Sequence, residues 1–159
     1  GNIFTLSTKF SSALDLNYKT EDSKDEPVFM GSYGIGPGRV MGTIVEVLSD
    51  DKGIIWPEAV APFAVHVLAL GDNEAVKTQA EKLYSDLVLA GVEALFDDRA
   101  ETSNGAKFAD ADLLGMPTRI VISERSLAAG GVEVKKRTEQ EGRIMTISEC
   151  TDFFTNTAK

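Results

Sequence analysis

Three glycines and an arginine form the first group of residues that could do chemistry. Gly34, Gly36 and Gly38 directly precede Arg39, where a helical pattern begins. Glycine lets the backbone approach a ligand closely, a helix N-terminus favours anions, and arginine can hold a phosphate with two hydrogen bonds. A tight turn against a neighbouring sheet explains these glycines at least as well. A Rossmann fingerprint fits poorly, because Pro37 interrupts the motif, Arg39 replaces the third glycine and no βαβ unit surrounds it.

A second group combines carboxylates with basic side chains. Asp97, Asp98 and Arg99 follow an apolar run, Lys107 comes shortly after them, and residues 133–137 alternate as a half-exposed strand that carries Glu133. A carboxylate can accept hydrogen bonds from the N–H groups of an unstacked guanine, and lysine or arginine can contact its O6 and N7 atoms or the phosphates. A surface salt-bridge network is the alternative, and composition alone favours it.

The charge balance and the rare residues exclude several other functions. Sixteen basic and 25 acidic residues give a net charge of −9, which argues against a non-specific nucleic-acid binder. Residues 99–143 hold eight basic and seven acidic residues, so this segment is less acidic than the rest and could host a local anion contact. A single histidine, His66, and a single cysteine, Cys150, exclude a two-histidine metal site, a cysteine-rich zinc site and an internal disulfide. His66 is expected to be a satisfied core or edge histidine, Cys150 is expected to pack from an amphipathic helix, and the default compartment is a reducing cytosol.

The elements that must position these groups follow from the spacing of apolar residues. In the first third we expect an exposed loop or hairpin tip at 19–27, a short strand at 27–30 and a helix at 39–48, without a core of their own. From about residue 56 strands and helices alternate. We expect strands at 63–70, 92–96, 118–123, 132–137 and 143–146, and helices at 73–90, 107–114 and 147–158. This order favours an α/β domain with a mostly parallel sheet, and Asp97–Arg99 then lie at the carboxyl end of a strand, where such sheets commonly bind ligands.

Six stretches of the chain together resemble the bacterial-type prolyl-tRNA synthetases. They are residues 1–11 (GNIFTLSTKFS), 30–39 (MGSYGIGPGR), 53–63 (GIIWPEAVAPF), 95–99 (LFDDR), 107–122 (KFADADLLGMPTRIVI) and 132–137 (VEVKKR). They cover nearly the whole chain, in the order and at the spacing of that class II family. The first three resemble the end of its catalytic domain, and the last three resemble its C-terminal anticodon-binding domain, a fold shared with threonyl-, glycyl- and histidyl-tRNA synthetases.

The resemblance implies two parts and a role for particular residues. Residues 1–55 would be a strand-loop-helix remnant of the catalytic domain, and 56–159 a three-layer α/β anticodon-binding domain with a five-stranded mixed sheet and flanking helices. Arg39 would hold the ATP triphosphate, and Gly34 and Gly36 would line the adenine pocket. The residues implied beside the proline pocket are Ser32, Asn2 and Phe4. The residues implied at the anticodon are Asp98, Arg99, Lys107, Glu133, Lys135 and Arg137.

The chain also departs from the family pattern at a few places. Ser7 stands where the family usually has glycine, and Pro37 and Gly38 replace a more usual Val-Ser or Val-Thr pair. The loop 100–106 lacks a second arginine that is often found there. These departures concern the detail of the proline pocket and of the loop's base contacts, and they leave Arg39, Asp98 and Glu133 in place.

The resemblance further implies what the parent protein does. It would be a proline–tRNA ligase that activates proline with ATP and Mg²⁺ and transfers it to tRNA(Pro), as a cytoplasmic homodimer without a membrane segment. This chain would supply anticodon recognition and the motif 3 wall of the ATP site. It would carry no complete catalytic set, no metal site and no tightly bound cofactor, and would be inactive alone. The alternatives are a non-catalytic accessory module that binds RNA or protein and a small nucleotide-binding α/β protein.

Overall fold

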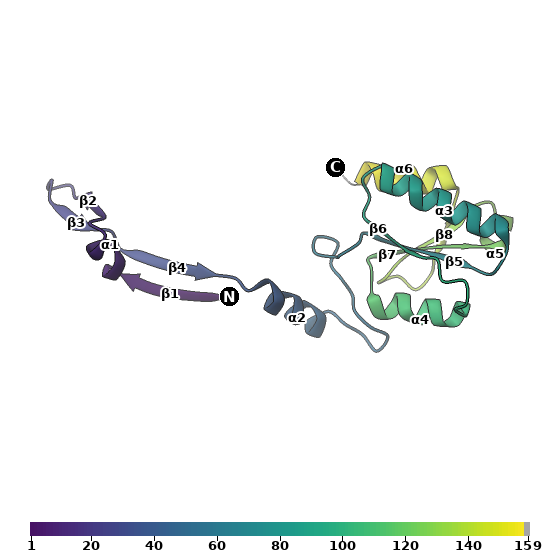
Figure 1. Ribbon diagram of the computed structural model, residues 1–159, viewed down its shortest axis with the longest axis horizontal. Helices are drawn as coiled ribbons and strands as arrows, with labels where there is room; N and C mark the ends of the chain where they lie inside the picture. The colour runs from purple at the N-terminus through teal and green to yellow at the C-terminus, as the bar shows by residue number, and fades with distance from the viewer. Residues whose placement is uncertain (158–159) are drawn as a thin grey trace. The chain divides into compact units, whose positions relative to one another are not determined.

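The computed structural model describes residues 1–157 and divides the chain into two compact units, Gly1–Ile44 and Val45–Lys159. In the first unit, β1 (Asn2–Ser7) pairs antiparallel with β4 (Met30–Gly34). The short helix α1 (Lys9–Ala13) and the hairpin of β2 (Asn17–Lys19) and β3 (Asp25–Pro27) lie between them in sequence (Figure 1). The exposed hairpin tip expected at 19–27 is confirmed, whereas α1 was missed.

Ser7 marks an irregularity in the first unit. Its φ is 54°, in the left-handed region that favours glycine, and the β1–β4 register shifts between Thr5 and Ser7. The backbone therefore takes at Ser7 the conformation for which glycine, the usual family residue, is suited. After β4 the chain enters α2 (Pro37–Val47), close to the helix expected at 39–48.

The second unit is built on a five-stranded sheet in the order β6-β5-β7-β8-β9. Its strands are β5 (Val65–Leu70), β6 (Ala94–Asp97), β7 (Thr118–Ser123), β8 (Val132–Lys136) and β9 (Arg143–Met145). Strand β5 pairs parallel with β6 and β7, while β7–β8 and β8–β9 pair antiparallel. The expected five-stranded mixed sheet is confirmed.

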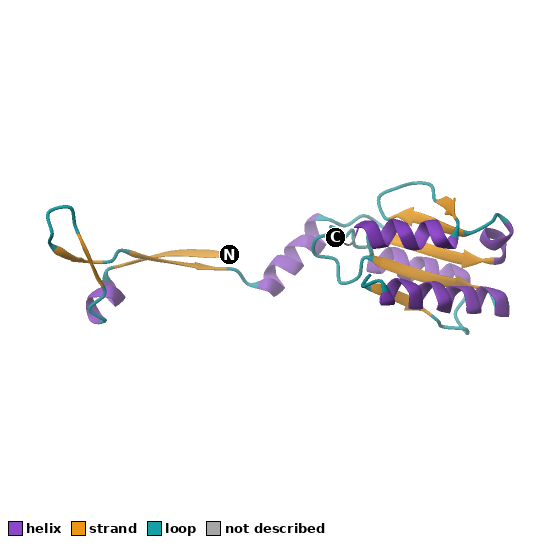
Figure 2. Ribbon diagram, turned by 90° about the horizontal axis from the view of Figure 1, so that it is seen from above, coloured by secondary structure: helices purple, strands orange, loops and turns teal. Residues whose placement is uncertain are grey.

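Helices cover both faces of this sheet and give three layers (Figures 1 and 2). Helices α3 (Glu74–Leu89) and α6 (Ile147–Thr157) pack on one face, and α4 (Asn104–Leu114) packs on the other. The apolar stripe of α3 predicted from the sequence is fully buried against β5, β7 and β8, together with the side chain of Cys150. Burial raises the pKa of the Cys150 thiol to about 12, so it stays protonated, as a core residue should.

Two helices of the second unit differ from the expected pattern. Helix α4 begins at Asn104 rather than at Lys107, because the side chain of Ser103 accepts a hydrogen bond from the backbone N–H of Ala106 and caps the helix. The short helix α5 (Glu124–Ala128) was missed; Ser123 and Ser126 form its reciprocal cap.

The segment that precedes β5, residues 45–56, is anchored to the C-terminal end of α4. The backbone N–H of Ile54 donates to Leu113 O and that of Trp56 donates to Gly115 O. The indole Nε1 of Trp56 donates to Leu114 O at 3.1 Å. Residues 45–56 thus belong to the compact second unit, although the family-based division lies between residues 55 and 56.

Candidate nucleic-acid interface

The α4 face of the sheet carries a row of polar side chains that strand pairing brings together. On β5, His66 lies opposite Leu95 of β6 and Arg119 of β7, and Arg119 lies opposite Lys135 of β8. Directly paired residues point to the same side of a sheet, so these side chains share one face. Helix α4 covers the β5 part of this face.

An ion cluster closes the β6 end of this face. The carboxylate of Asp97 accepts from Arg99 Nε at 2.9 Å and from Arg99 Nη2 at 2.7 Å, and the same nitrogen reaches Asp110 at 2.8 Å. Lys107 Nζ lies 3.8 Å from the Asp97 carboxylate and donates to Ala69 O at 2.8 Å. These contacts, led by the Arg99 hydrogen bonds, hold the pKa of Asp97 below its usual value. Arg99 and Lys107 are therefore engaged within the protein.

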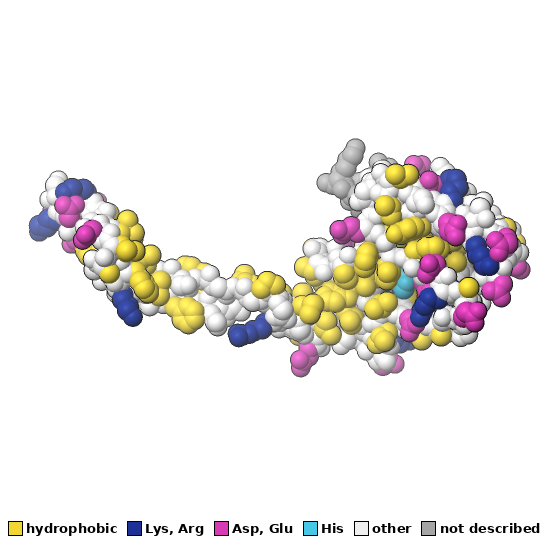
Figure 3. All heavy atoms as spheres, in the orientation of Figure 1, with side chains coloured by type: hydrophobic (Ala, Val, Ile, Leu, Met, Phe, Trp, Pro, Cys, Tyr) yellow, Lys and Arg dark blue, Asp and Glu magenta, His cyan; other side chains and the backbone are white. Residues whose placement is uncertain are grey.

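Asp98 follows this cluster and borders a first hollow, called here the Asp98 hollow. It has a volume of about 360 Å³. It is lined by His66, Leu95, Phe96, Asp97, Asp98, Arg99, Asp110, Leu113 and Leu114. Asp98 is exposed, and among residues 1–157 no hydrogen bond or ion pair occupies its carboxylate. Figure 3 shows the histidine in cyan where apolar side chains meet acidic and basic ones.

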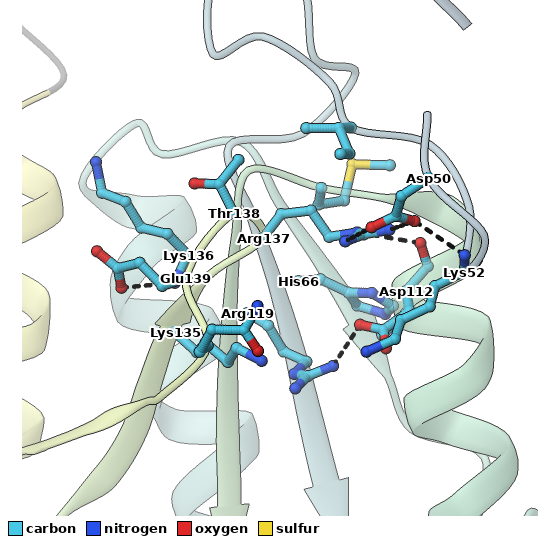
Figure 4. A pocket seen from close by; sticks show the side chains of 14 residues that line it. Asp50, Lys52, His66, Asp112, Arg119, Lys135, Lys136, Arg137, Thr138 and Glu139 are labelled. Atoms are coloured by element: carbon cyan, nitrogen blue, oxygen red, sulfur yellow. Dashed lines mark hydrogen bonds and ion pairs between the residues drawn. The ribbon is translucent and has the colours of Figure 1, made fainter. Parts of the chain in front are cut away.

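A second hollow, called here the Arg119 hollow, has a volume of about 270 Å³ and shares His66 with the first (Figure 4). Arg119, Lys135 and Arg137 contribute its basic side chains. Arg119 Nη1 donates to Asp112 at 2.8 Å, and its guanidinium lies over the Phe108 ring, 4.7 Å from the centroid.

Arg137 holds the chain segment that borders the Arg119 hollow. Its Nη1 and Nη2 donate to Asp50 at 2.9 and 2.6 Å, and its Nε donates to Asp112 O at 3.3 Å. The Arg137 side chain is 8% exposed, and its two hydrogen bonds hold the pKa of Asp50 far below the usual range. Arg137 thus clamps the segment before Ile54 onto the sheet.

Asp50→Asn is expected to loosen this clamp. Because the pKa of Asp50 is lowered in the fold, its contribution is complete above the ordinary value of 3.8 and is lost as the pH falls through the lowered one. At neutral pH the substitution should therefore shift the fluorescence of Trp56, the single tryptophan, to the red and make it easier to quench. Asp51→Asn removes the same charge without breaking the two-bond pair, and an equal response of both variants would contradict the clamp.

Glu133 lies on the same sheet face but lines neither hollow. It pairs with Val121 of β7 and Ile144 of β9, and it precedes Lys135 on β8 by two residues, so the two side chains point to the same face. Among the described residues its carboxylate takes no hydrogen bond or ion pair. The six residues expected at the anticodon lie on or beside the α4 face, but they do not share one hollow. Asp98 and Arg99 line the Asp98 hollow, Lys135 and Arg137 line the Arg119 hollow, and Lys107 and Glu133 line neither. Asp98, Glu133 and Lys135 are left with free polar groups, whereas Arg99, Lys107 and Arg137 bond within the chain.

The sequence reasoning missed three contributors to this face. His66 was expected to be a satisfied core or edge histidine; it is 3% exposed, but its Nδ1 has no hydrogen-bond partner in the described chain. Burial lowers the pKa of His66, which keeps the imidazole neutral. Arg119 and Asp50 had no assigned role. No local sequence pattern identifies them, because their contacts form through strand pairing and through packing of the segment before β5 against the sheet.

The first unit holds the other predicted site residues. In the β1–β4 ladder, Asn2 pairs with Gly34 and Phe4 pairs with Ser32, so these four lie on one face of the two-stranded sheet. Arg39 is in the first turn of α2; its backbone N–H donates to Gly36 O, and its exposed side chain has no ion pair within residues 1–157.

Residues 1–157 contain neither a membrane-spanning helix nor a metal-binding cluster of side chains. No helix there is both long and apolar enough to cross a bilayer. Nor do three or more histidine, cysteine, aspartate or glutamate side chains gather there in a way that could hold a metal ion.

Comparison with known proteins agrees with this architecture. The anticodon binding domain family matches residues 64–157. The chain is 47% identical over 150 residues to a proline–tRNA ligase of Shouchella clausii, covering 94% of this chain and 26% of that protein. It is 44% identical over 154 residues to a proline–tRNA ligase of Bacillus subtilis, covering 96% of this chain and 27% of that protein. The chain thus spans about a quarter of the length of these curated relatives.

A solved structure shows the same fold. Prolyl-tRNA synthetase from Cryptosporidium parvum, complexed with halofuginone and AMPPNP, aligns with a TM-score of 0.77 and 23% identity over 98% of this chain and 34% of that chain. The resemblance seen in the sequence motifs is confirmed by these relatives, and the chain belongs to the anticodon binding domain family.

Proposed function

We propose that this chain is part of a proline–tRNA ligase, which activates proline with ATP and transfers it to tRNA(Pro), and that residues 64–157 bind the anticodon. The observation that carries this proposal is the 44–47% identity to proline–tRNA ligases over at least 94% of the chain. An accessory module without catalytic relatives is not favoured, because the similarity extends through the first third as well as through the anticodon binding domain.

Among the six residues named from the motifs, base recognition is assigned to the side chains that the fold leaves free. Asp98 and Glu133 can accept from the N–H groups of a guanine, and Lys135 can donate to its O6 or N7. Arg99 and Lys107 position the chain around Asp98 through Asp97, and Arg137 positions the Arg119 hollow. This division separates groups that contact RNA from groups that hold the interface in place.

Glu133→Gln is expected to weaken binding of the proline tRNA anticodon stem-loop by about 5- to 150-fold, which corresponds to one lost base contact of about 1–3 kcal/mol. Glutamine keeps the size of the side chain and removes the carboxylate that would accept from a base. Fluorescence anisotropy with labelled stem-loop RNA at fixed salt measures the effect. Glu141→Gln removes one charge from the nearby turn as a control for general electrostatics. Base readout would be refuted by equal binding of an unrelated anticodon stem-loop.

The first unit is proposed to supply one wall of the ATP and proline sites. The residues present leave room for a ligand beside Arg39: a side chain added at Gly34 meets no atom within 4 Å, and one at Gly36 meets only the Arg39 side chain. Arg39 would hold the triphosphate of ATP, which supplies the activating group, while Asn2, Phe4 and Ser32 would face proline. Mg²⁺ is expected to accompany ATP in the whole ligase.

The remaining family properties are proposals of the same kind. We assign residues 1–55 to the catalytic domain and 56–159 to the anticodon-binding domain, although the compact units join between Ile44 and Val45. A cytoplasmic homodimer is the expected state of the whole ligase. Gel filtration of the whole ligase tests the dimer separately from RNA binding.

A further inference from the structure

The Arg119 hollow has two buried polar atoms without a partner. Within the described chain, Nδ1 of His66 and Nε of Arg119 are closed off from solvent and make no hydrogen bond. Buried polar groups are nearly always hydrogen-bonded, so two unpaired ones on adjacent strands of one face require an explanation. Both side chains line this hollow, and His66 also lines the Asp98 hollow.

The Arg119 guanidinium is held in place before any ligand arrives. The carboxylate of Asp112 accepts a hydrogen bond from Arg119 Nη1 at 2.8 Å, and the guanidinium carbon lies 4.7 Å from the centroid of the Phe108 ring. The side chain is 15% exposed, so little of its freedom remains to be lost on binding. Figure 4 shows it between His66 and Lys135, with the edge that Asp112 leaves free turned away from that carboxylate.

The charges around the hollow favour a ligand with hydrogen-bond acceptors. Two of its three acidic residues are held by arginines, since Asp50 accepts from Arg137 and Asp112 accepts from Arg119. The third, Glu139, accepts from the backbone N–H of Lys136 at 3.4 Å. Lys135 has no ion pair among the described residues and lies directly opposite Arg119. Two neighbouring donors match the paired O6 and N7 acceptors of guanine, whereas adenine offers one acceptor and one donor on that edge.

We propose that Arg119 is a specificity-determining residue that contacts the O6/N7 edge of one anticodon guanine in this hollow, with His66 as the wall between it and the neighbouring hollow. This inference rests on the proposed function. The base then offers acceptors to the edge of the guanidinium that Asp112 leaves free. A second base then occupies the Asp98 hollow across His66.

The test uses the 159-residue chain and stem-loop RNAs in which each anticodon guanosine is replaced in turn by 7-deazaguanosine, which lacks N7. Wild-type protein should bind one of these RNAs more weakly than the unmodified stem-loop, by roughly 5- to 150-fold if a two-bond contact is lost. Arg119→Lys keeps the charge but not the fork-shaped donor edge, and should bind both RNAs with nearly the same affinity.

Asp112→Asn is the matched control, because it breaks the same ion pair and leaves the guanidinium. It should retain the discrimination against 7-deazaguanosine. The inference is overturned if Arg119→Lys, folded by circular dichroism, still discriminates, or if Asp112→Asn loses discrimination equally, since Arg119 would then act through structure alone. If wild-type protein does not distinguish the proline stem-loop from an unrelated one, the proposed function fails as well. Those results are separable, because the first set leaves recognition of the proline stem-loop intact.

Discussion

Asp97→Asn is expected to destabilise the second unit by about 3–5 kcal/mol, the usual effect of removing one partner from a buried ion pair. The side chains of Asp97 and Lys107 are 4% and 5% exposed. Asparagine keeps the shape of Asp97 but leaves the Lys107 ammonium as an uncompensated charge in the interior, and it takes one acceptor from Arg99. Urea unfolding at pH 7, followed by circular dichroism, measures the free energy of unfolding.

The pH dependence gives this prediction a second readout. The pKa of Asp97 is lowered in the fold, chiefly by Arg99, so its contribution is complete above the ordinary value of 3.8 and is lost as the pH falls through the lowered value. The difference between wild type and Asp97→Asn should therefore shrink below about pH 4. Asp98→Asn, the exposed neighbour, should change stability by less than about 0.5 kcal/mol. Similar losses in both variants, or a gap that does not depend on pH, would disprove the buried-pair account.

The cluster around Asp97 explains why Asp98 can serve as a recognition group. Asp97 ends β6, and the two hydrogen bonds from Arg99 fix the turn that follows the strand. Asp98 lies within that turn, so its carboxylate is held at the edge of the hollow by neighbours that do not contact RNA. A rigid support of this kind reduces the conformational entropy lost on binding. Loss of Asp97 should thus affect both the stability of the domain and RNA affinity.

The fold could be predicted from the sequence wherever a local pattern reports burial. The apolar run ending at Leu70 became the interior strand β5, which is buried on both faces. The α3 stripe was correct because Val76, Ala80, Leu83 and Leu87 repeat at helical spacing. The start of α4 was predicted too late, because Gly105 and its polar neighbours resemble a loop. The hydrogen bond by which Ser103 caps the helix could not be read from the sequence.

The site was harder to predict, because its residues meet through pairing of distant segments. Asp98, Glu133 and Lys135 could be named from motifs, but nothing in the sequence places Arg119 between His66 and Lys135. That juxtaposition depends on the register of β5, β7 and β8. The partners of Arg99 and Arg137 were equally hidden, because a charged residue in a sequence does not reveal whether it is already paired.

Gly115→Ala is expected to destabilise the second unit by about 2–5 kcal/mol. About 1–2 kcal/mol comes from placing a residue other than glycine in the left-handed conformation, and about 1–3 kcal/mol comes from overpacking. Gly115 ends α4 with φ 68°, and its N–H donates to Ala111 O. A Cβ there would overlap the backbone carbonyl of Ile54, so either the end of α4 or the segment that contains Ile54 would have to move. The loss should appear in the free energy of unfolding and as a red shift of Trp56 fluorescence, since Trp56 bonds to Leu114 and Gly115.

Gly91→Ala separates backbone strain from this clash. Gly91 has φ 82°, and a Cβ there meets no atom within 4 Å, so the substitution should cost about 1–2 kcal/mol and leave Trp56 fluorescence unchanged. If the two variants lose the same stability, the contact between Ile54 and the end of α4 contributes nothing. If Gly115→Ala loses more and exposes Trp56, the returning segment is packed on α4 as part of the domain. The clamp of Asp50 and Arg137 then acts on a segment already held at its other end by Gly115, which keeps the border of the Arg119 hollow fixed from both sides.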